Sequence, residues 1–330
     1  MSFFFPVHRP RAGLSITERG IALVELRRGW HRPGIVRLNE RTLPEGVLAL
    51  SASEPNVKDR DALTKELRAL MARSSERTLA VCLPDRVCHL AVFPFEALPP
   101  LERDRDPILR WRFQHEEHVA VGDARVLHRV FPAESSMATT LHGITSGSPV
   151  TAYVLAMAIK RSVLEQYENV CLQAGLLPLS ISCAALWLLD FYRPVMTQAG
   201  ELFFVHRASG SMTFIAIRQG VPVFCRVKGL RGERTDVMRE IRSTVQFYED
   251  LYPRGAGSGS VPIYMVGEGC SWLEGPTSQV ASPETVTTGK QAASLMPQPI
   301  VPDWKSLVST QSGVVSTEEG LYALACAVGR

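Results

Sequence analysis

The sequence has no long hydrophobic run and no strong excess of charge of either sign. None of its 330 residues lies in a stretch of the ~18 consecutive apolar residues that a membrane-spanning helix requires. The first residues, MSFFFPVHRPR, have too short an apolar run and the wrong order of charges for a secretory signal peptide. The formal net charge of +3 is too small to favour nucleic acid through bulk electrostatics. These absences predict a cytoplasmic protein with no membrane span and no nucleic-acid partner.

Motifs for metal binding and for covalent catalysis are also missing. The cysteines stand singly, with no C-x-x-C pair and no histidine at ligand spacing, at positions 82, 88, 171, 183, 225, 270 and 326. Most of them lie in apolar contexts, so we expect reduced thiols in the core. The run from His115 to His118 is not H-E-x-x-H and has no third ligand, which favours a solvated helix face. We therefore predict no metal site and no catalytic triad.

Two similar series of elements follow one another along the chain. The first consists of a β-hairpin at 13–29, a strand at 35–42, an amphipathic helix at 59–74 and a strand at 78–83. The second consists of strands at 201–206, 211–218 and 221–227, a helix at 235–251 and a strand at 262–266. A duplicated series of this kind predicts an α/β, actin-like (ribonuclease-H-like) fold with two lobes.

A further group of elements interrupts the first series. A strand at 87–95, a helix at 108–119 and a strand at 124–131 indicate a small inserted subdomain, after which a strand at 153–159 returns to the first lobe. The expected boundaries are 12–86 and 151–192 for the two parts of the first lobe, 87–150 for the inserted subdomain, 193–315 for the second lobe, and 316–330 for a C-terminal helix that returns to the first lobe.

The turn of the first hairpin raises the question of phosphate binding. In several nucleotide-binding folds such a turn cradles a phosphate, and it then needs small residues and backbone N–H donors without a competing negative charge. Here the turn carries Glu18 and Arg19. The sequence therefore predicts that this position is blocked to phosphate.

An ordered series of segments resembles the PilM family of type IV pilus assembly proteins, which are actin-like relatives of the cell-division protein FtsA. The segments are ITERGIALVEL, RTLPEGVL, ILRWRFQHEEHV, VLAMAIKRSVLEQYENVCLQAGLLPLSISCAAL, MTFIAIRQGVPVFCRV, EIRSTVQFYEDLYP, IYMVGEGCSWLEG and ALACAVGR. The resemblance covers nearly the whole chain and is weakest at 132–150 and 275–315. It implies the same two-lobed fold that the element order predicts.

The departures from the family pattern fall on the two phosphate hairpins. Nucleotide-binding members begin the first hairpin with an aspartate, an apolar residue and a glycine, where this chain has Ser15, Ile16 and Thr17. In the second hairpin, His206 and Ala208 replace the expected acid and glycine. The resemblance therefore implies a vestigial nucleotide cleft at Ser15, Thr17, Gly20, Gly210, Ser211, Gly267 and Gly269.

Loss of these acids argues against catalysis, because metal-assisted phosphoryl transfer depends on positioning of the nucleotide and its metal. We expect no ATP hydrolysis and no ATP or Mg²⁺ cofactor. Binding of nucleotide without chemistry is left open, since backbone donors can persist without the acids.

By resemblance, the chain is a non-catalytic scaffold at the cytoplasmic face of the inner membrane, in the platform of a type IV pilus or a related secretion machine. Such a protein binds the cytoplasmic N-terminal tail of a PilN-like membrane protein in a groove between the first lobe and its inserted subdomain. Expected wall residues are Trp111, Phe93 and Phe95, although core packing is the other interpretation of such aromatic residues.

Two alternatives stay open at this point. One is an actin-like protein that binds or hydrolyses ATP, which the missing acids oppose. The other is the cytosolic domain of a GspL-like type II secretion protein. Homo-oligomerisation and further platform partners are also left open.

Overall fold

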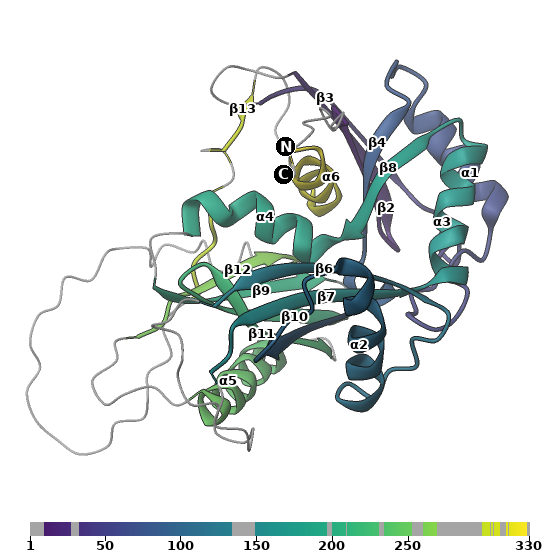
Figure 1. Ribbon diagram of the computed structural model, residues 1–330. Helices are drawn as coiled ribbons and strands as arrows, with labels where there is room; N and C mark the ends of the chain where they lie inside the picture. The colour runs from purple at the N-terminus through teal and green to yellow at the C-terminus, as the bar shows by residue number, and fades with distance from the viewer. Residues whose placement is uncertain are drawn as a thin grey trace, which may run out of the picture.

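The computed structural model describes residues 10–27, 33–133, 149–196, 200–208, 210–230, 234–252, 260–268, 299–303, 305, 307–310, 315 and 317–328. Within these residues the chain forms three β-sheets flanked by helices (Figure 1). The two larger sheets correspond to the two predicted lobes, and the smallest sheet is formed by the inserted region. In this part of the chain we find no helix that combines the length and hydrophobicity of a membrane span.

The first lobe is built on a six-stranded mixed sheet. Its strands, in spatial order, are β13 (Ser309–Thr310), β3 (Gly34–Thr42), β2 (Gly20–Arg27), β1 (Ala12–Ile16), β4 (Thr78–Leu83) and β8 (Leu177–Cys183). The hairpin strands β1, β2 and β3 are antiparallel, whereas β4 lies parallel to both β1 and β8. The pairing of β13 with β3 differs from the expected boundaries, which placed residues 193–315 in the second lobe.

Helices cover both faces of this sheet. Helices α1 (Arg60–Leu70) and α3 (Arg161–Gln173) pack on one face, and α4 (Ala184–Met196) and α6 (Glu318–Val328) pack on the other (Figure 1). Because side chains alternate along a strand, Leu14 faces α1 and α3 while Val24 faces α4 and α6. Both faces are therefore apolar, which explains why β1 and β2 have near-continuous hydrophobic sequences.

The three-stranded sheet consists of β5 (His89–Phe95), β7 (Ala152–Lys160) and β6 (Ala124–Pro132), with β7 in the centre. The sequence analysis placed this central strand in the first lobe, but β7 pairs on both sides with strands of the inserted region. Its continuous apolar sequence is typical of a central strand in any sheet, so the pattern did not identify the sheet to which it belongs.

Helix α2 (Glu102–His115) covers one face of the three-stranded sheet, and both of its ends differ from the prediction of 108–119. The helix begins before Pro107, which is tolerated within it, and acids in its first turn complement the helix dipole. It ends early because His118 takes a left-handed conformation with φ 56°, and the N–H of Val119 donates to the carbonyl of Phe113 at 3.0 Å.

The second lobe repeats the hairpin pattern in a four-stranded sheet. Its strands, in spatial order, are β11 (Val221–Gly229), β10 (Ser211–Arg218), β9 (Glu201–Ala208) and β12 (Ile263–Gly267). Helix α5 (Arg234–Leu251) packs on one face through Ile241 and Tyr248, and the edge strand β11 lies beside β5 of the inserted region. The three-stranded sheet thus adjoins the second lobe as well as the first.

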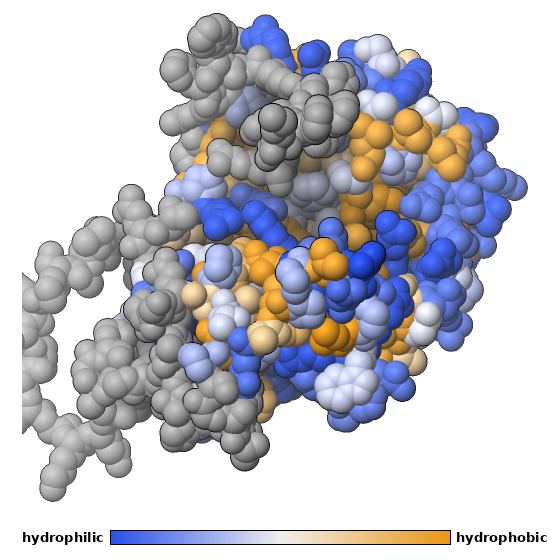
Figure 2. All heavy atoms as spheres, in the orientation of Figure 1, coloured by the Kyte–Doolittle hydropathy of each residue, from blue (hydrophilic) through white to orange (hydrophobic). Residues whose placement is uncertain are grey.

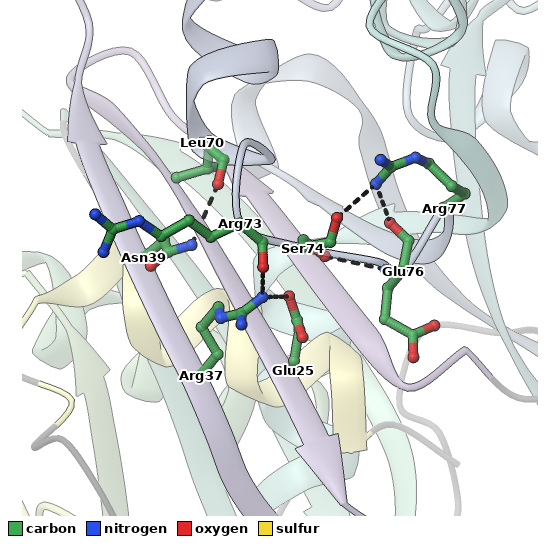
Figure 3. A network of polar contacts seen from close by, with 8 residues as sticks. All are labelled: Glu25, Arg37, Asn39, Leu70, Arg73, Ser74, Glu76 and Arg77. Atoms are coloured by element: carbon green, nitrogen blue, oxygen red, sulfur yellow. Dashed lines mark hydrogen bonds and ion pairs between the residues drawn. The ribbon is translucent and has the colours of Figure 1, made fainter.

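Side chains of β3 contact the last residue of α1 and the turn that follows it, where backbone carbonyls have no partner within the helix (Figure 3). The amide of Asn39 donates to the carbonyl of Leu70 at 3.2 Å. The guanidinium of Arg37 donates to the carbonyl of Arg73 and, at 3.2 Å, to the carboxylate of Glu25. These contacts tie the helix to the sheet and fix the first lobe around the hairpin.

The cysteines are predominantly core residues, as expected. In the described part of the chain the free thiols at 82, 88, 171, 183 and 326 are buried and Cys225 is half-buried, while Cys270 lies outside the described residues. Burial raises the pKa of Cys171 to about 12. Such a thiol is a poor nucleophile at neutral pH.

Helix α6 approaches the first hairpin so closely that only glycine fits between them. A Cβ atom on Gly13 would lie 2.0 Å from the carbonyl oxygen of Ala323 and 2.6 Å from the backbone nitrogen of Ala327. Because Gly13 has no side chain, α6 can pack directly against the backbone of β1.

We predict that Gly13→Ala lowers the free energy of unfolding by about 3 kcal/mol, since a methyl group against helix backbone can be accommodated only by moving α6. Urea unfolding followed by circular dichroism measures the change. Gly122→Ala is the matched control, because a Cβ there meets nothing within 4 Å. Equal stability of the two variants would contradict the packing argument.

Candidate functional site

A cavity of about 530 Å³ lies between the lobes. Its wall combines the first hairpin turn, the end of β3, the end of β4, the start of α6 and residues of β9, β10 and the segment after β12. The predicted cleft residues Ser15, Thr17, Gly20 and Ser211 all line it. The fold thus brings these four together, although they come from opposite halves of the chain.

Two of the other predicted cleft residues, Gly210 and Gly267, do not line this cavity. Gly210 occupies the β9–β10 turn with φ 69°, and a Cβ there would lie 3.7 Å from a guanidinium nitrogen of Arg86. Gly267 ends β12 with φ 100°, and a Cβ there would lie 2.0 Å from the carbonyl oxygen of Arg207. Gly267 therefore allows the backbones of β12 and β9 to lie close together. Gly269 lies outside the described residues.

The first hairpin turn uses its own hydrogen-bond donors. The N–H of Thr17 donates to the carbonyl of Gly20 at 2.9 Å, and the N–H of Gly20 donates to the hydroxyl of Thr17 at 3.1 Å. The same hydroxyl lies 3.0 Å from a carboxylate oxygen of Glu319 on α6. These two N–H groups are therefore engaged within the turn, whereas a phosphate loop presents such donors to the phosphate.

An ion pair spans the mouth of the cavity. Arg19 in the first hairpin turn donates to the carboxylate of Glu268, which follows β12 in the second lobe, at 2.6 Å. Because the Arg19 side chain is 67% exposed, the pair contributes little to stability. Its position nevertheless places two side chains where the lobes face each other.

A buried carboxylate joins the lobes beneath the cavity. Asp85, which follows β4 and is 1% exposed, accepts hydrogen bonds from Nδ1 of His206 at 2.6 Å and from the hydroxyl of Thr213 at 2.6 Å. The N–H of Ala185, at the start of α4, donates to its other oxygen at 2.8 Å. Nε2 of His206 lies 3.1 Å from the hydroxyl oxygen of Tyr322 on α6. We call these five residues the interlobe cluster.

The electrostatics of the interlobe cluster favour the ionised carboxylate. Burial opposes ionisation and is the largest influence on the pKa of Asp85. The charge of His206 together with hydrogen bonds from His206, Thr213 and Ala185 outweighs it, so that the pKa lies below its ordinary value of 3.8. A carboxylate with these donors has little remaining capacity to bind a metal ion.

Sequence analysis did not identify Asp85. The available signal was its place directly after Pro84, at the carboxyl end of a buried strand that lies parallel to its neighbours β1 and β8. Polar residues at such ends gather at one edge of the sheet, where functional sites are usual. The sequence did single out His206 as a departure from the family pattern, and the structure shows that this residue contacts the missed acid.

The predicted partner-binding residues separate into buried and exposed ones. Phe93 and Phe95 are 1% and 8% exposed, and they pack beneath α2, where Arg112 lies over both rings. This corrects the prediction that they form an accessible wall. Trp111 is 55% exposed and stacks on His115 with ring centroids 4.6 Å apart.

A second cavity, of about 450 Å³, lies between the first lobe and the inserted region. It separates β8 from β6, which are outer strands of their respective sheets. Leu127 on β6 and Leu179 on β8 line it and are 40% and 46% exposed, while Met157 and Ile159 of β7 lie deeper. Figure 2 shows hydrophobic surface over the region of β8. We call this cavity the edge groove.

We predict that Asp85→Asn lowers the free energy of unfolding by about 3 kcal/mol at neutral pH, because it removes the charge that His206 and Thr213 contact in a buried site. Because the pKa of Asp85 is lower in the folded state than in the unfolded state, ionisation of this carboxyl stabilises the fold at any pH above the ordinary carboxyl pKa. This stabilisation is lost as the pH falls through the folded-state pKa. Urea unfolding between neutral pH and about pH 3 should therefore show a smaller acid-induced loss in the variant.

Asp250→Asn, a change at an exposed position of α5, is the matched control and should leave both stability and its pH dependence unchanged. If the free energy of unfolding of Asp85→Asn changed with pH as it does in the wild type, ionisation of Asp85 would contribute nothing to stability.

No family model and no curated protein sequence matches the chain. Among solved structures, a chain of the "PilM-PilN type IV pilus biogenesis complex" is similar at 17% identity and a TM-score of 0.67, covering 96% of this chain and 98% of that one.

Two further structures are more distant. A Bacteroides thetaiotaomicron protein described as having an actin-like ATPase fold and unknown function is 10% identical with a TM-score of 0.46, covering 83% of this chain and 89% of that one. The cytoplasmic domain of EpsL, an inner-membrane component of the type II secretion system of Vibrio cholerae, is 9% identical with a TM-score of 0.46, covering 95% and 94%. The chain thus has an α/β, two-lobed actin-like fold, similar throughout its length to a chain of the PilM–PilN complex.

Proposed function

We propose that this protein is a non-catalytic scaffold in the inner-membrane platform of a type IV pilus or a related secretion machine. It acts at the cytoplasmic face and binds the N-terminal tail of a PilN-like membrane protein. The observation that supports this most directly is the similarity over 96% of the chain to a component of the PilM–PilN complex. The resemblance of the sequence to the PilM family points in the same direction.

The interior of the cleft supports a role without phosphoryl transfer. Such chemistry needs donors and metal-binding acids aimed at the phosphates. Here the turn donors of Thr17 and Gly20 are used internally, and the carboxylate of Asp85 is held by His206 and Thr213. The interlobe cluster joins the lobes through contacts between protein groups, which supports a scaffold that works without a nucleotide.

The edge groove is the place where we expect the tail. An outer strand has backbone N–H and C=O groups that can pair with an added extended peptide. The groove offers such edges on both sides, from β6 and β8. Leu127 and Leu179 provide apolar contacts for side chains of the tail, and charged residues such as Arg125 and Glu168 line the cavity with them. An apolar centre with polar residues beside it is typical of a peptide site.

We predict that Leu127→Asp and Leu179→Asp each weaken tail binding by about tenfold or more, because each places a charge where an apolar side chain of the tail would be buried. The measurement is isothermal titration calorimetry with a synthetic peptide of the neighbouring PilN-like protein's N-terminal tail. Leu172→Asp is the matched control, since Leu172 is 53% exposed on α3 and does not line the edge groove. Retained affinity in both groove variants would refute this location.

Trp111→Ala tests the other predicted anchor in the same assay. The exposed ring lies on α2, whereas the edge groove is lined by β6, β7, α3 and β8. Weakened binding by this variant alone would place the tail against α2. Stabilisation of the wild type by Mg-ATP, with none by the peptide, would instead overturn the scaffold proposal.

A further inference from the structure

The interlobe cavity has an excess of negative charge. Its wall contains the five glutamates 18, 40, 268, 318 and 319 and the three arginines 19, 41 and 86. Two of these arginines are already paired: Arg19 with Glu268 at 2.6 Å, and Arg41 at 2.6 Å with Glu66, which is not part of the wall. The remaining field therefore attracts a cation and repels a phosphate.

Two of the carboxylates lie at the start of α6. Glu40 at the end of β3 accepts a short hydrogen bond from the hydroxyl of Thr317, and Glu319 lies 3.0 Å from the hydroxyl of Thr17. The helix N-terminus accounts for some stabilisation of Glu319. Glu40 reaches the same helix N-terminus from a β-strand, so the helix end stabilises a second carboxylate that is not part of the helix.

An unpartnered hydroxyl in the same cavity points independently to a ligand. Ser15 on β1 lines the cavity, its side chain is fully buried, and its Oγ has no hydrogen-bond partner among the described residues. Buried hydroxyls are nearly always hydrogen-bonded, because an unsatisfied one costs free energy. A bound donor would satisfy this oxygen.

The arrangement of the acids indicates which kind of cation would bind. In the part of the chain that the structure describes, no three histidine, cysteine or acidic side chains converge as metal ligands. The carboxylates instead lie along a cavity whose wall also includes Ile16, Leu83 and Pro84. Such a wall suits a ligand whose methylene groups contact the apolar side chains while its ammonium groups, set apart from each other, meet the acids.

We propose that the interlobe cavity binds a linear alkylammonium ligand, with ammonium groups at Glu40 and Glu319 and a donor to Ser15. The source is a free polyamine or two neighbouring lysine side chains of a protein, and the alkylammonium chemistry is the same for both. The proposal does not depend on the proposed function, because the edge groove shares only Leu83 with this cavity and none of its glutamates.

The test is calorimetry and thermal shift at physiological ionic strength with spermidine and, separately, with a blocked lysine dipeptide. We expect stabilisation by at least one of them. The double variant Glu40→Gln and Glu319→Gln should weaken binding by about tenfold, since it keeps the hydrogen-bond acceptors and removes the charge. Binding of spermidine alone identifies a free polyamine as the source, and binding of the dipeptide alone identifies a protein side chain.

The control double variant, Glu45→Gln and Glu54→Gln, makes the same change of charge at exposed positions outside the cavity. Equal weakening by both double variants would show that the ligand responds only to net charge and would overturn the proposal, as would the absence of binding at millimolar concentration. Ser15→Ala should weaken binding severalfold without lowering the melting temperature. Tail binding in the edge groove should stay unchanged in every cavity variant, so failure of one proposal is distinguishable from failure of the other.

Discussion

The carboxylate of Asp85 is the contact on which the arrangement of the two lobes depends. It receives donors from β9, β10 and α4, and through His206 it reaches the hydroxyl of Tyr322 on α6. A buried charge must be compensated on all sides, and each of these elements is in place only when the others are. The single residue Asp85 thus connects the second lobe, α4 and α6 to the first sheet.

This cluster makes closure of the lobes a property of the chain itself. In a fold whose lobes meet around a cleft, a bound ligand commonly bridges the two halves. Here the bridging is done below the cleft by Asp85 and His206 and at its mouth by Arg19 and Glu268. The wall of the cleft above the cluster differs in charge from a phosphate site, because it carries more glutamates than arginines.

Most of the fold could be predicted from the periodicity of the sequence, and part of the site could not. The hairpins, α1, α5 and α6 carry strong local patterns and lie where they were expected. The sheet to which β7 belongs and the burial of Phe93 depend on partners distant in sequence. The early end of α2 at His115 depends on the left-handed conformation of His118, which the periodicity of the sequence does not reveal. Ser15, Thr17, Gly20 and Ser211 were found by analogy of position. Asp85 was missed because its partners His206 and Thr213 lie more than a hundred residues away in the sequence, and its place after a buried strand was the only local signal.

The tight contact between Gly13 and α6 has a consequence for synthesis of the protein. Residues 12–27 are synthesised long before residues 318–328, yet α6 covers the face of the hairpin that carries Ala22 and Val24. Until α6 has been made, helix α4 is the only one of the two helices on this face of the sheet, and apolar side chains of β1 and β2 are open to association with other chains. Folding of the first lobe therefore depends on synthesis of α6, and a chain interrupted before residue 318 would expose apolar strands to chaperones and proteases.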